Sequence, residues 1–255
     1  MTGHHRQSRP VVRTTIALVL LLVASAPILA MDEPPEASDH LPALTPISAT
    51  YGATMDKGLS INGSATRTLE QQPDGSWLYR FDVNSFIADI TESVTFNWKN
   101  GHIQPLKYRY ALKGLMIRNR SRALNFNHTA NTVSGSYEGE SFNMPLMEGA
   151  LDPLGFQLQL QQDLKAGKKD VTYAVADDGD FDEDRFAVIG EETQDTPFGE
   201  QRTVKVEKVR DADSKRSTLM WFAPELDYLL VRLVQVEPDG SRYEVNLKDA
   251  DLAAP

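Results

Sequence analysis

The chain has 255 residues, no cysteine and a net charge of −10. Without cysteine, disulfides and thiolate zinc sites are excluded, so the fold must be stabilised by a hydrophobic core. The strongly acidic balance excludes nucleic acid as a partner bound through the overall electrostatic field.

Residues 1–30 have the pattern of a secretory signal peptide. Basic residues precede the apolar run 16–23, and small residues lead to Ala30. The run is shorter than the about 20 apolar residues that a membrane span needs, so we expect cleavage after Ala30 and a periplasmic protein. Cleavage would remove three arginines and no acid, taking the net charge from −10 to −13. The alternative is an uncleaved segment 11–29 that anchors the protein in the inner membrane.

The composition then changes along the chain. Residues 31–46 hold four prolines among acids, which predicts a flexible leader. Residues 47–250 are long enough for a single β-rich domain with a substantial core. Residues 251–255 are expected to form a frayed tail.

Alternation with a period of two dominates this domain. Val94, Phe96 and Trp98 alternate with polar residues, and Tyr243, Val245 and Leu247 do the same near the carboxyl end. Such alternation is typical of half-buried antiparallel strands, and Pro-Asp-Gly-Ser turns at 73–76 and 238–241 separate some of them. We predict a mainly β protein of roughly a dozen strands, a long antiparallel meander curled into an open or closed barrel.

One segment, 152–166, predicts a helix instead. Asp152 and Pro153 are typical of a helix start, and Gly167 followed by lysines is typical of a helix end. Apolar residues at 154, 156, 158, 160 and 164 would form two stripes on a helix, so we expect a buried helix in the mouth of the curled sheet.

Three stretches resemble a family of exported bacterial proteins known only as a domain of unknown function, the 3108 family. They are "DPLGFQLQLQQDLKAG", "FAVIGEETQDTPFGEQRTVKVEKV" and "MWFAPELDYLLVRL", the last being the most specific. The resemblance implies a secreted or periplasmic all-β protein with no assigned reaction, and it supplies no catalytic residues.

The last of these stretches predicts a structural hairpin. One strand ends with Trp221 and Phe222, Pro224 fixes the turn, and the return strand is apolar on both faces. The residues expected to build it are Trp221, Phe222, Pro224, Leu226 and Tyr228. Glu225 and Asp227 resemble a catalytic pair, but acids at a tight turn favour a structural role, so no catalytic residue is predicted.

The acidic run 177–184 is a weak candidate for a metal site through Asp178, Asp180 and Asp182. It does not match the EF-hand pattern, because Glu183 occupies the glycine position and Ile189 the last position. We therefore predict a solvated loop, and neither a metal nor a cofactor.

A basic stretch stands out in this acidic chain. Six cations and no acid fall between residues 107 and 122. A tight turn at Lys113 and Gly114 would place Arg109 opposite Arg118 and Lys107 opposite Arg120, and such like-charge pairs destabilise a sheet. Either the acidic run 177–184 or an anionic ligand should compensate. The candidate ligand or partner contacts are Lys107, Arg109, Arg118, Arg120 and Arg122.

Three functions follow in order of preference. The first is a non-enzymatic periplasmic binding or carrier module for a lipid or another apolar or anionic amphipathic envelope ligand. The second is an envelope assembly factor with a filled core that binds another protein. The third is an enzyme acting on envelope polymers. A large apolar cavity would favour the first, a packed interior the second, and a cleft with convergent acids the third.

Overall fold

The computed structural model describes residues 43–115 and 117–252. The chain divides into two units, Met1–Asp39 and His40–Pro255, and all that follows concerns the second. The expected signal peptide, the alternative anchor and most of the leader lie outside the described residues. Within the described part, no helix has the length and apolar character needed to span a bilayer.

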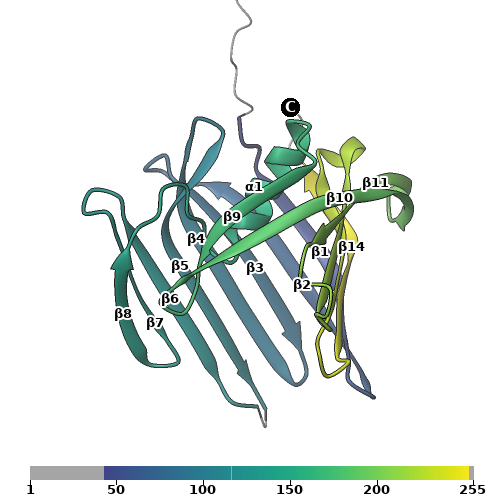
Figure 1. Cartoon of the computed structure of the whole chain (residues 1–255). Helices are drawn as coiled ribbons and strands as arrows, with labels where there is room; N and C mark the ends of the chain where they lie inside the picture. The colour runs from purple at the N-terminus through teal and green to yellow at the C-terminus, as the bar shows by residue number, and fades with distance from the viewer. Residues whose placement is uncertain (1–42, 116, 253–255) are drawn as a thin grey trace, which may run out of the picture. The chain divides into compact units, whose positions relative to one another are not determined.

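Fourteen antiparallel strands form one sheet (Figure 1). The first eight strands are β1 (Ile47–Asp56), β2 (Ser60–Gln71), β3 (Trp77–Ser85), β4 (Ala88–Lys99), β5 (His102–Gly114), β6 (Arg120–Asn127), β7 (Thr132–Tyr137) and β8 (Glu140–Pro145). The remaining strands are β9 (Asp170–Ala176), β10 (Phe181–Thr196), β11 (Gly199–Lys208), β12 (Ser217–Ala223), β13 (Leu229–Val236) and β14 (Arg242–Leu252). β14 continues two residues into the range expected for the tail.

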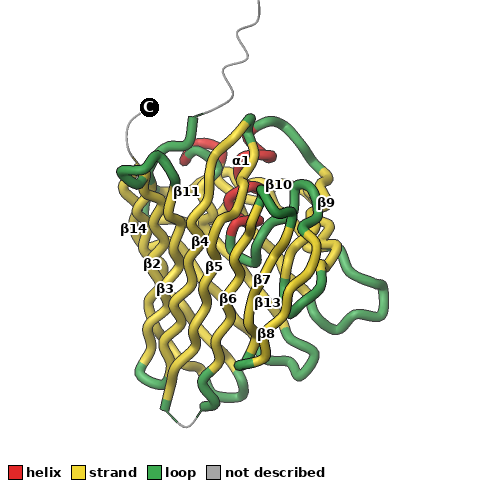
Figure 2. The backbone as a smooth tube through the Cα atoms, turned by 90° about the vertical axis from the view of Figure 1, so that its left-hand side faces the viewer, coloured by secondary structure: helices red, strands yellow, loops and turns green. Residues whose placement is uncertain are grey.

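The sheet is two meanders joined in the middle. β1 to β8 run in sequence to one edge, β14 back to β9 run to the other, and β1 pairs with β14. The edge strands β8 and β9 do not pair with each other, so the curled sheet stays open (Figure 2). The predicted antiparallel meander is confirmed, in its open form.

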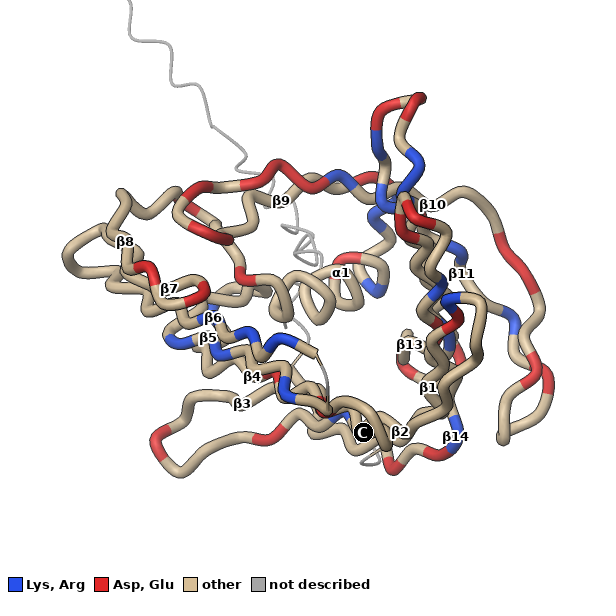
Figure 3. Tube along the Cα trace, turned by 90° about the horizontal axis from the view of Figure 1, so that it is seen from below, with Lys and Arg blue, Asp and Glu red and all other residues tan. Residues whose placement is uncertain are grey.

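The helix α1 (Gly155–Lys165) lies inside the curl, as the view from below shows (Figure 3). Leu158, Leu160 and Leu164 are buried, and Phe156 stacks on Phe186 of β10 with 5.1 Å between ring centroids. Both apolar stripes are therefore covered, which confirms the buried helix. It begins at Gly155, later than Pro153, and the Asp152 carboxylate accepts hydrogen bonds from the amides of residues 154 and 155.

Glutamines between the leucines fix α1 to the sheet. Gln157 accepts a hydrogen bond from Arg67 of β2, and Gln159 accepts one from the amide of Ile103 of β5. Gln161 donates to the carbonyl of Asp227, in the turn between β12 and β13. The leucines and glutamines alternate here, as they would on a half-buried strand, but the segment is a helix that packs through its leucines and hydrogen-bonds through its glutamines.

Candidate functional site

The inner face of β1 to β6 is arranged in tiers of residues that pair across neighbouring strands. The upper tier is buried and consists of Ile47, Leu69, Tyr79, Val94, Tyr108 and Leu124. The next tier is polar and aromatic and consists of Arg67, Phe81, Glu92, Tyr110, Arg122 and Tyr137. The lower tier is again apolar and consists of Ala65, Val83, Ile90 and Leu112, ending at Arg120.

A pocket of about 250 Å³ opens at the polar tier. It is lined by Glu92, Tyr108, Tyr110, Arg120, Ser121, Arg122, Tyr137 and Pro153. Two guanidinium groups, three phenols and a carboxyl group therefore converge on one space, beside the approach to α1. Pockets of this kind, with a few convergent polar groups, are where small ligands bind.

Arg122 is the most enclosed cation of the pocket. Its Nη1 lies 2.5 Å from Oδ1 of Asp177, in the turn between β9 and β10, and the Tyr137 ring centroid lies 4.9 Å from its Cζ. Its side chain is 20% exposed. The guanidinium is thus held between an aromatic ring and a carboxylate and still lines the pocket.

Three carboxyl groups near the pocket have raised pKa values. Burial raises the pKa of Glu92, whose carboxylate accepts a 2.6 Å hydrogen bond from the Tyr108 hydroxyl. Burial likewise raises the pKa of Asp152 to about 7, against the opposing effect of two backbone amides. The pKa of Asp177 is raised by burial although Arg122 opposes the shift. Perturbed groups of this kind in a pocket are typical of functional sites.

Arg67 continues the polar tier deep into the core and is only 5% exposed. It donates to the Tyr79 hydroxyl at 2.7 Å and to Oε1 of Gln157 at 2.9 Å. The rings of Tyr51, Tyr79 and Phe81 lie within 6 Å of its guanidinium carbon. This charge is therefore stabilised by phenols, an amide and aromatic faces.

The sequence reasoning missed Arg67, Glu92, Tyr108, Tyr110 and Tyr137. A signal was present, because Glu92 is in phase with the inward-facing Ile90 and Val94, and Arg67 is in phase with Leu69. A charged residue at an inward position of an amphipathic strand is a candidate site residue.

The predicted pairing of the basic stretch is wrong. β5 ends at Gly114 and β6 begins at Arg120, so residues 115–119 form a longer connection than the expected turn. Arg109 pairs with Ala123 and Lys107 with Asn125, and no like charges are opposed. The basic residues also divide between the two faces of the sheet, since Lys107 and Arg109 alternate with the buried Tyr108.

The four arginines of the basic stretch find partners within the protein. Arg118 and Arg120 contact Glu138 of the β7–β8 turn at 3.1 and 3.5 Å, and Arg122 contacts the acidic run at Asp177. Arg109, on the outer face, donates to the carbonyl of Leu124. Of the candidate contacts, only Arg120 and Arg122 line the pocket.

The prediction of a solvated loop holds only for residues 177–180 of the acidic run, which form the turn from β9 to β10, because residues 181–184 belong to β10. Asp178 and Asp180 lie in that turn, and Asp182 lies in β10 opposite Val175. Among the described residues, no group of three or more His, Cys, Asp or Glu is arranged to hold a metal ion.

The hairpin of Trp221 joins β12 to β13 through a short 3-10 helix, Pro224–Leu226. Trp221 is only 4% exposed, but its cross-strand neighbours are Lys205 and Arg232. These cations lie 5.3 and 4.8 Å from its ring centroid, and its Nε1 donates to Glu192 at 2.8 Å. Trp221 is therefore buried like its neighbours Met220 and Phe222, and charged side chains provide part of its cover.

The return strand departs from simple alternation. An irregularity in the β12–β13 pairing leaves Val231 between the partners of Trp221 and Phe222, and residues 229–231 are all buried. The Tyr51 hydroxyl donates to the carbonyl of Leu230 there. The strand therefore has apolar residues in both alternation phases partly because it contains a β-bulge, which shifts the inward-facing positions by one residue.

The turn of this hairpin docks on α1. Oδ1 of Asp227 lies 2.6 Å from Nζ of Lys165, while Glu225 is exposed. Leu226 and Tyr228 are half-buried and pack against the core. These contacts give Asp227 a structural role as the partner of a helical lysine.

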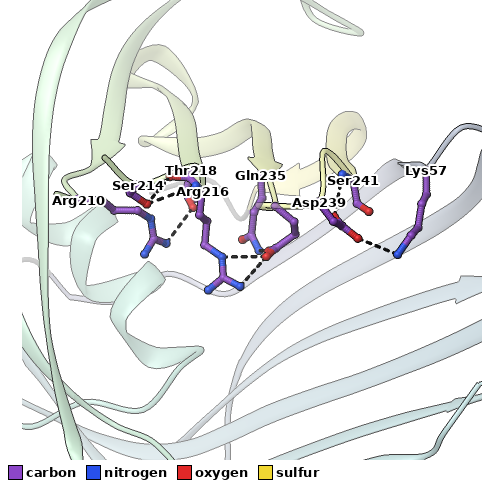
Figure 4. Close-up of polar contacts among 9 residues, drawn as sticks. Lys57, Arg210, Ser214, Arg216, Thr218, Gln235, Asp239 and Ser241 are labelled. Carbon is purple, nitrogen blue, oxygen red and sulfur yellow. Dashed lines mark hydrogen bonds and ion pairs between the residues drawn. The ribbon is translucent and has the colours of Figure 1, made fainter. Parts of the chain in front are cut away.

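A second polar cluster lies near the turns that flank β12 and β14 (Figure 4). Arg216 donates twice to Glu237, and Gln235 donates to the other oxygen of that carboxylate. Lys57 pairs with Asp239 at 2.8 Å. These charges neutralise one another at the surface. We therefore interpret the cluster as structural contacts between strand ends.

The fold and the pocket define an open, barrel-like all-β protein with a polar tier on its inner face. The chain belongs to a family described as "Protein of unknown function (DUF3108)", whose model matches residues 48–248. No curated protein matches it.

Two solved structures match the chain to different degrees. The crystal structure of a beta-barrel-like protein of the domain of unknown function DUF1849 from Brucella abortus superposes with a TM-score of 0.56 at 11% identity, covering 84% of this chain and 100% of that one. A DUF1329 family protein from Desulfovibrio piger gives a TM-score of 0.25 at 11% identity, covering 85% and 89%. The first likeness supports the barrel-like fold alone.

Proposed function

We propose that the protein is a non-enzymatic, periplasmic binding or carrier module for an anionic amphipathic envelope ligand. The anionic group would bind at Arg120 and Arg122, and the apolar part would lie along the lower tier of the inner face. The observation that carries the proposal is the register, which makes Arg120 the end of an apolar row of Val83, Ile90 and Leu112.

The lower tier suits an apolar chain because its side chains are incompletely buried. Val83, Ile90 and Leu112 are only partly buried, whereas the upper tier on the same strands is fully covered. An apolar chain placed on this row would remove those side chains from water, at about 25 cal/mol per Å². The pocket then supplies guanidinium groups that pair with carboxylate or phosphate oxygens.

The ligand would lie on the open face of β3 to β6, because α1 packs tightly on its other side. There, a hollow lined by Leu160, Leu164 and Phe186, among others, does not admit a water molecule. This tight packing on one side of α1 supports the alternative of an assembly factor that binds an envelope protein. The two alternatives differ in the molecule that should co-purify with the protein, an amphipathic ligand or another protein.

Native mass spectrometry of protein purified from a periplasmic fraction tests this. A co-purified anionic amphipath supports the binding module, and a stoichiometric protein partner without such a ligand supports the assembly factor. A direct test titrates the purified chain with lysophosphatidylglycerol, which is anionic. Lysophosphatidylcholine, which is zwitterionic and has no net charge, is the control.

We expect Arg122→Gln to weaken lysophosphatidylglycerol binding about tenfold, since a charge-assisted hydrogen bond contributes roughly 1.5–3 kcal/mol. Arg109→Gln is the matched control, because Arg109 lies on the outer face of the neighbouring strand. Equal affinity of both variants and the parent would contradict the placement of the anionic group.

The convergence of acids keeps an enzyme acting on envelope polymers as a second candidate. Glu92 and Asp152 interact electrostatically, and a carboxyl group with a raised pKa can act as a general acid. If the purified protein hydrolyses peptidoglycan fragments or envelope glycans, and Glu92→Gln abolishes turnover while the fold persists, this candidate replaces the first.

A further inference from the structure

The turns at one end of the amino-terminal meander carry exposed apolar side chains. Leu59 in the β1–β2 turn is 75% exposed, Phe86 in the β3–β4 turn is 79% exposed, and Leu115 after β5 is 71% exposed. Ile117, also in the β5–β6 connection, is 39% exposed. We call Leu59, Phe86, Leu115 and Ile117 the rim patch. The turns that carry it lie at the lower end of the strands in Figures 1 and 2.

The turns at the opposite end of the same strands are polar. Residues 72–76, between β2 and β3, read Gln-Pro-Asp-Gly-Ser, and the β4–β5 turn is Asn100 and Gly101. Residues 128–131, between β6 and β7, read His-Thr-Ala-Asn. The meander therefore has one polar end and one end at which consecutive turns project large apolar groups into water.

Two of the apolar turns form a single surface. The amide of Leu115 donates a 2.8 Å hydrogen bond to the carbonyl of Ile87, which joins the β5–β6 connection to the β3–β4 turn. Phe86 and Leu115 therefore project from turns that contact each other. Exposed apolar groups gathered in this way mark an interaction site.

Exposed cations lie beside the part of this surface that the β3–β4 and β5–β6 connections form. Lys113 is exposed and makes no ion pair among the described residues, and the Arg118 side chain is 76% exposed although it contacts Glu138. Asp89 faces Lys113 in the register of β4 and β5. Beside Phe86 and Leu115, Lys113, Arg118 and Arg120 thus meet two carboxylates, Asp89 and Glu138, and the cations exceed them by one in a chain with a net charge of −10.

We propose that the rim patch docks the protein on an anionic lipid bilayer. Leu59, Phe86 and Leu115 would enter the boundary between headgroups and acyl chains, and Lys113 and Arg118 would pair with lipid phosphates. Peripheral proteins bind such membranes through two attractions: the burial of apolar side chains and the pairing of cations with anionic lipids. The surface is separate from the pocket, so it does not depend on the proposed ligand.

The absence of native cysteine allows a site-specific test. The full chain is labelled with the fluorophore NBD at one introduced cysteine, as Phe86→Cys, Leu115→Cys or Phe198→Cys. Phe198 is the matched control, because it is 43% exposed in the β10–β11 turn, away from the rim patch. All three proteins carry the same amino-terminal segment, so any membrane affinity of that segment affects them equally.

On addition of phosphatidylglycerol–phosphatidylcholine vesicles, we expect the probes at 86 and 115 to shift to the blue and to be quenched by spin-labelled lipid. The probe at 198 should keep its spectrum in water. No response at 86 and 115, or an equal response at 198, would overturn the proposal. A blue shift at 86 and 115 that grows with protein concentration without vesicles would assign the patch to a second copy of the chain.

Vesicle sedimentation measures the energetics. We expect Phe86→Ser with Leu115→Ser to lower partitioning about tenfold or more, a factor that corresponds to about 1.4 kcal/mol. Phe198→Ser should leave partitioning unchanged. Lys113→Glu should weaken binding at low salt only, since exposed charges are screened within about 10 Å at 0.1 M salt. Equal binding to pure phosphatidylcholine vesicles would overturn the anionic preference.

Discussion

Trp221 shows how a buried aromatic residue can be enclosed by charged side chains. Its indole is enclosed by Lys205, Arg232 and Glu192. Removing the ring would leave two cations and a carboxylate around an empty space, so we expect Trp221→Ala to lower the free energy of unfolding by about 3–5 kcal/mol. Trp221→Phe should lose about 1 kcal/mol, chiefly the hydrogen bond to Glu192. Thermal or denaturant unfolding of both variants measures this, and an unchanged alanine variant would contradict it.

The turn next to Trp221 allows a finer comparison. Glu225 is exposed, so Glu225→Gln should change stability by less than about 0.5 kcal/mol. Asp227 pairs with Lys165 of α1, and Asn tolerates the left-handed backbone at this position (φ 56°). We therefore expect Asp227→Asn to cost about 0.5–1 kcal/mol, the value of one exposed ion pair, with urea unfolding as the measurement.

Asp152 makes stability depend on pH. Its pKa is about 7 in the folded protein, above the ordinary value of 3.8, because the carboxyl is buried and lies near the Glu92 carboxyl. Between pH 4 and pH 7 the folded state therefore binds more protons than the unfolded state, and this group's contribution to stability falls as pH rises. Above pH 7 the loss is complete, on the order of a few kcal/mol, since one pKa unit corresponds to about 1.4 kcal/mol.

The variant Asp152→Asn should remove this dependence. Its amide oxygen can still accept from the amides of residues 154 and 155, so near pH 3 the variant and the parent should be equally stable. At pH 8 the variant should be more stable than the parent. Denaturant unfolding across this pH range gives the difference, and parallel curves for the two proteins would contradict the burial of an ionised Asp152.

At the scale of elements, the open seam between β8 and β9 is bridged by side chains. Arg122 of β6 pairs with Asp177 of the β9–β10 turn, and Gly179 of the same turn lies against the Phe142 ring of β8. A double-mutant cycle with Arg122→Gln and Asp177→Asn should give a coupling energy of about 1–3 kcal/mol, because both side chains are largely buried. The exposed pair Arg185 and Asp170 is the control and should couple by less than about 1 kcal/mol.

The elements themselves follow well from local patterns, because alternation and turn chemistry depend on neighbours in sequence. The turns at Asp74 and Asp239 both use an aspartate oxygen to accept from the amide two residues on, as their shared sequence predicts. The β5–β6 register could not be predicted, because residues 115–119 give no sharp turn signal and a small shift re-pairs every cation. The bulge at Val231 likewise depends on packing by distant strands.

Only part of the candidate site could be predicted from the sequence. The inward phase of Arg122 with Leu124 and Phe126 is visible in the alternation, and so is the acidic run that provides Asp177. The convergence of Glu92, Tyr110 and Tyr137 on that arginine depends on the register of four strands. The pocket also needs Pro153, whose position depends on where α1 enters the curl.

At the scale of the molecule, the pairing of β1 with β14 brings the two ends of the domain together. Ile47 pairs with Leu252, while Met147 to Gly149 form an exposed connection between β8 and α1. A circular permutant of residues 43–252, opened at Glu148 and joined by a short Gly-Ser linker, should therefore keep the fold. We expect a circular dichroism spectrum like the parent's and a loss of stability of less than about 2 kcal/mol, close to the entropy of a changed loop. A permutant opened within β4 is the control, and it should not fold.

Because β1 pairs with the last strand of the chain, one of its edges remains unpaired during most of synthesis. β1 can pair with β2 as soon as that hairpin emerges, but its other edge has no partner until residues 242–252 have been made. At roughly 5–20 residues per second, the chain between these strands takes on the order of 10–40 s to be synthesised. Throughout that interval the row of backbone donors and acceptors on β1 is open to strands of other chains. The strand at the centre of the finished sheet is thus, for the nascent protein, the edge that most needs protection from aggregation.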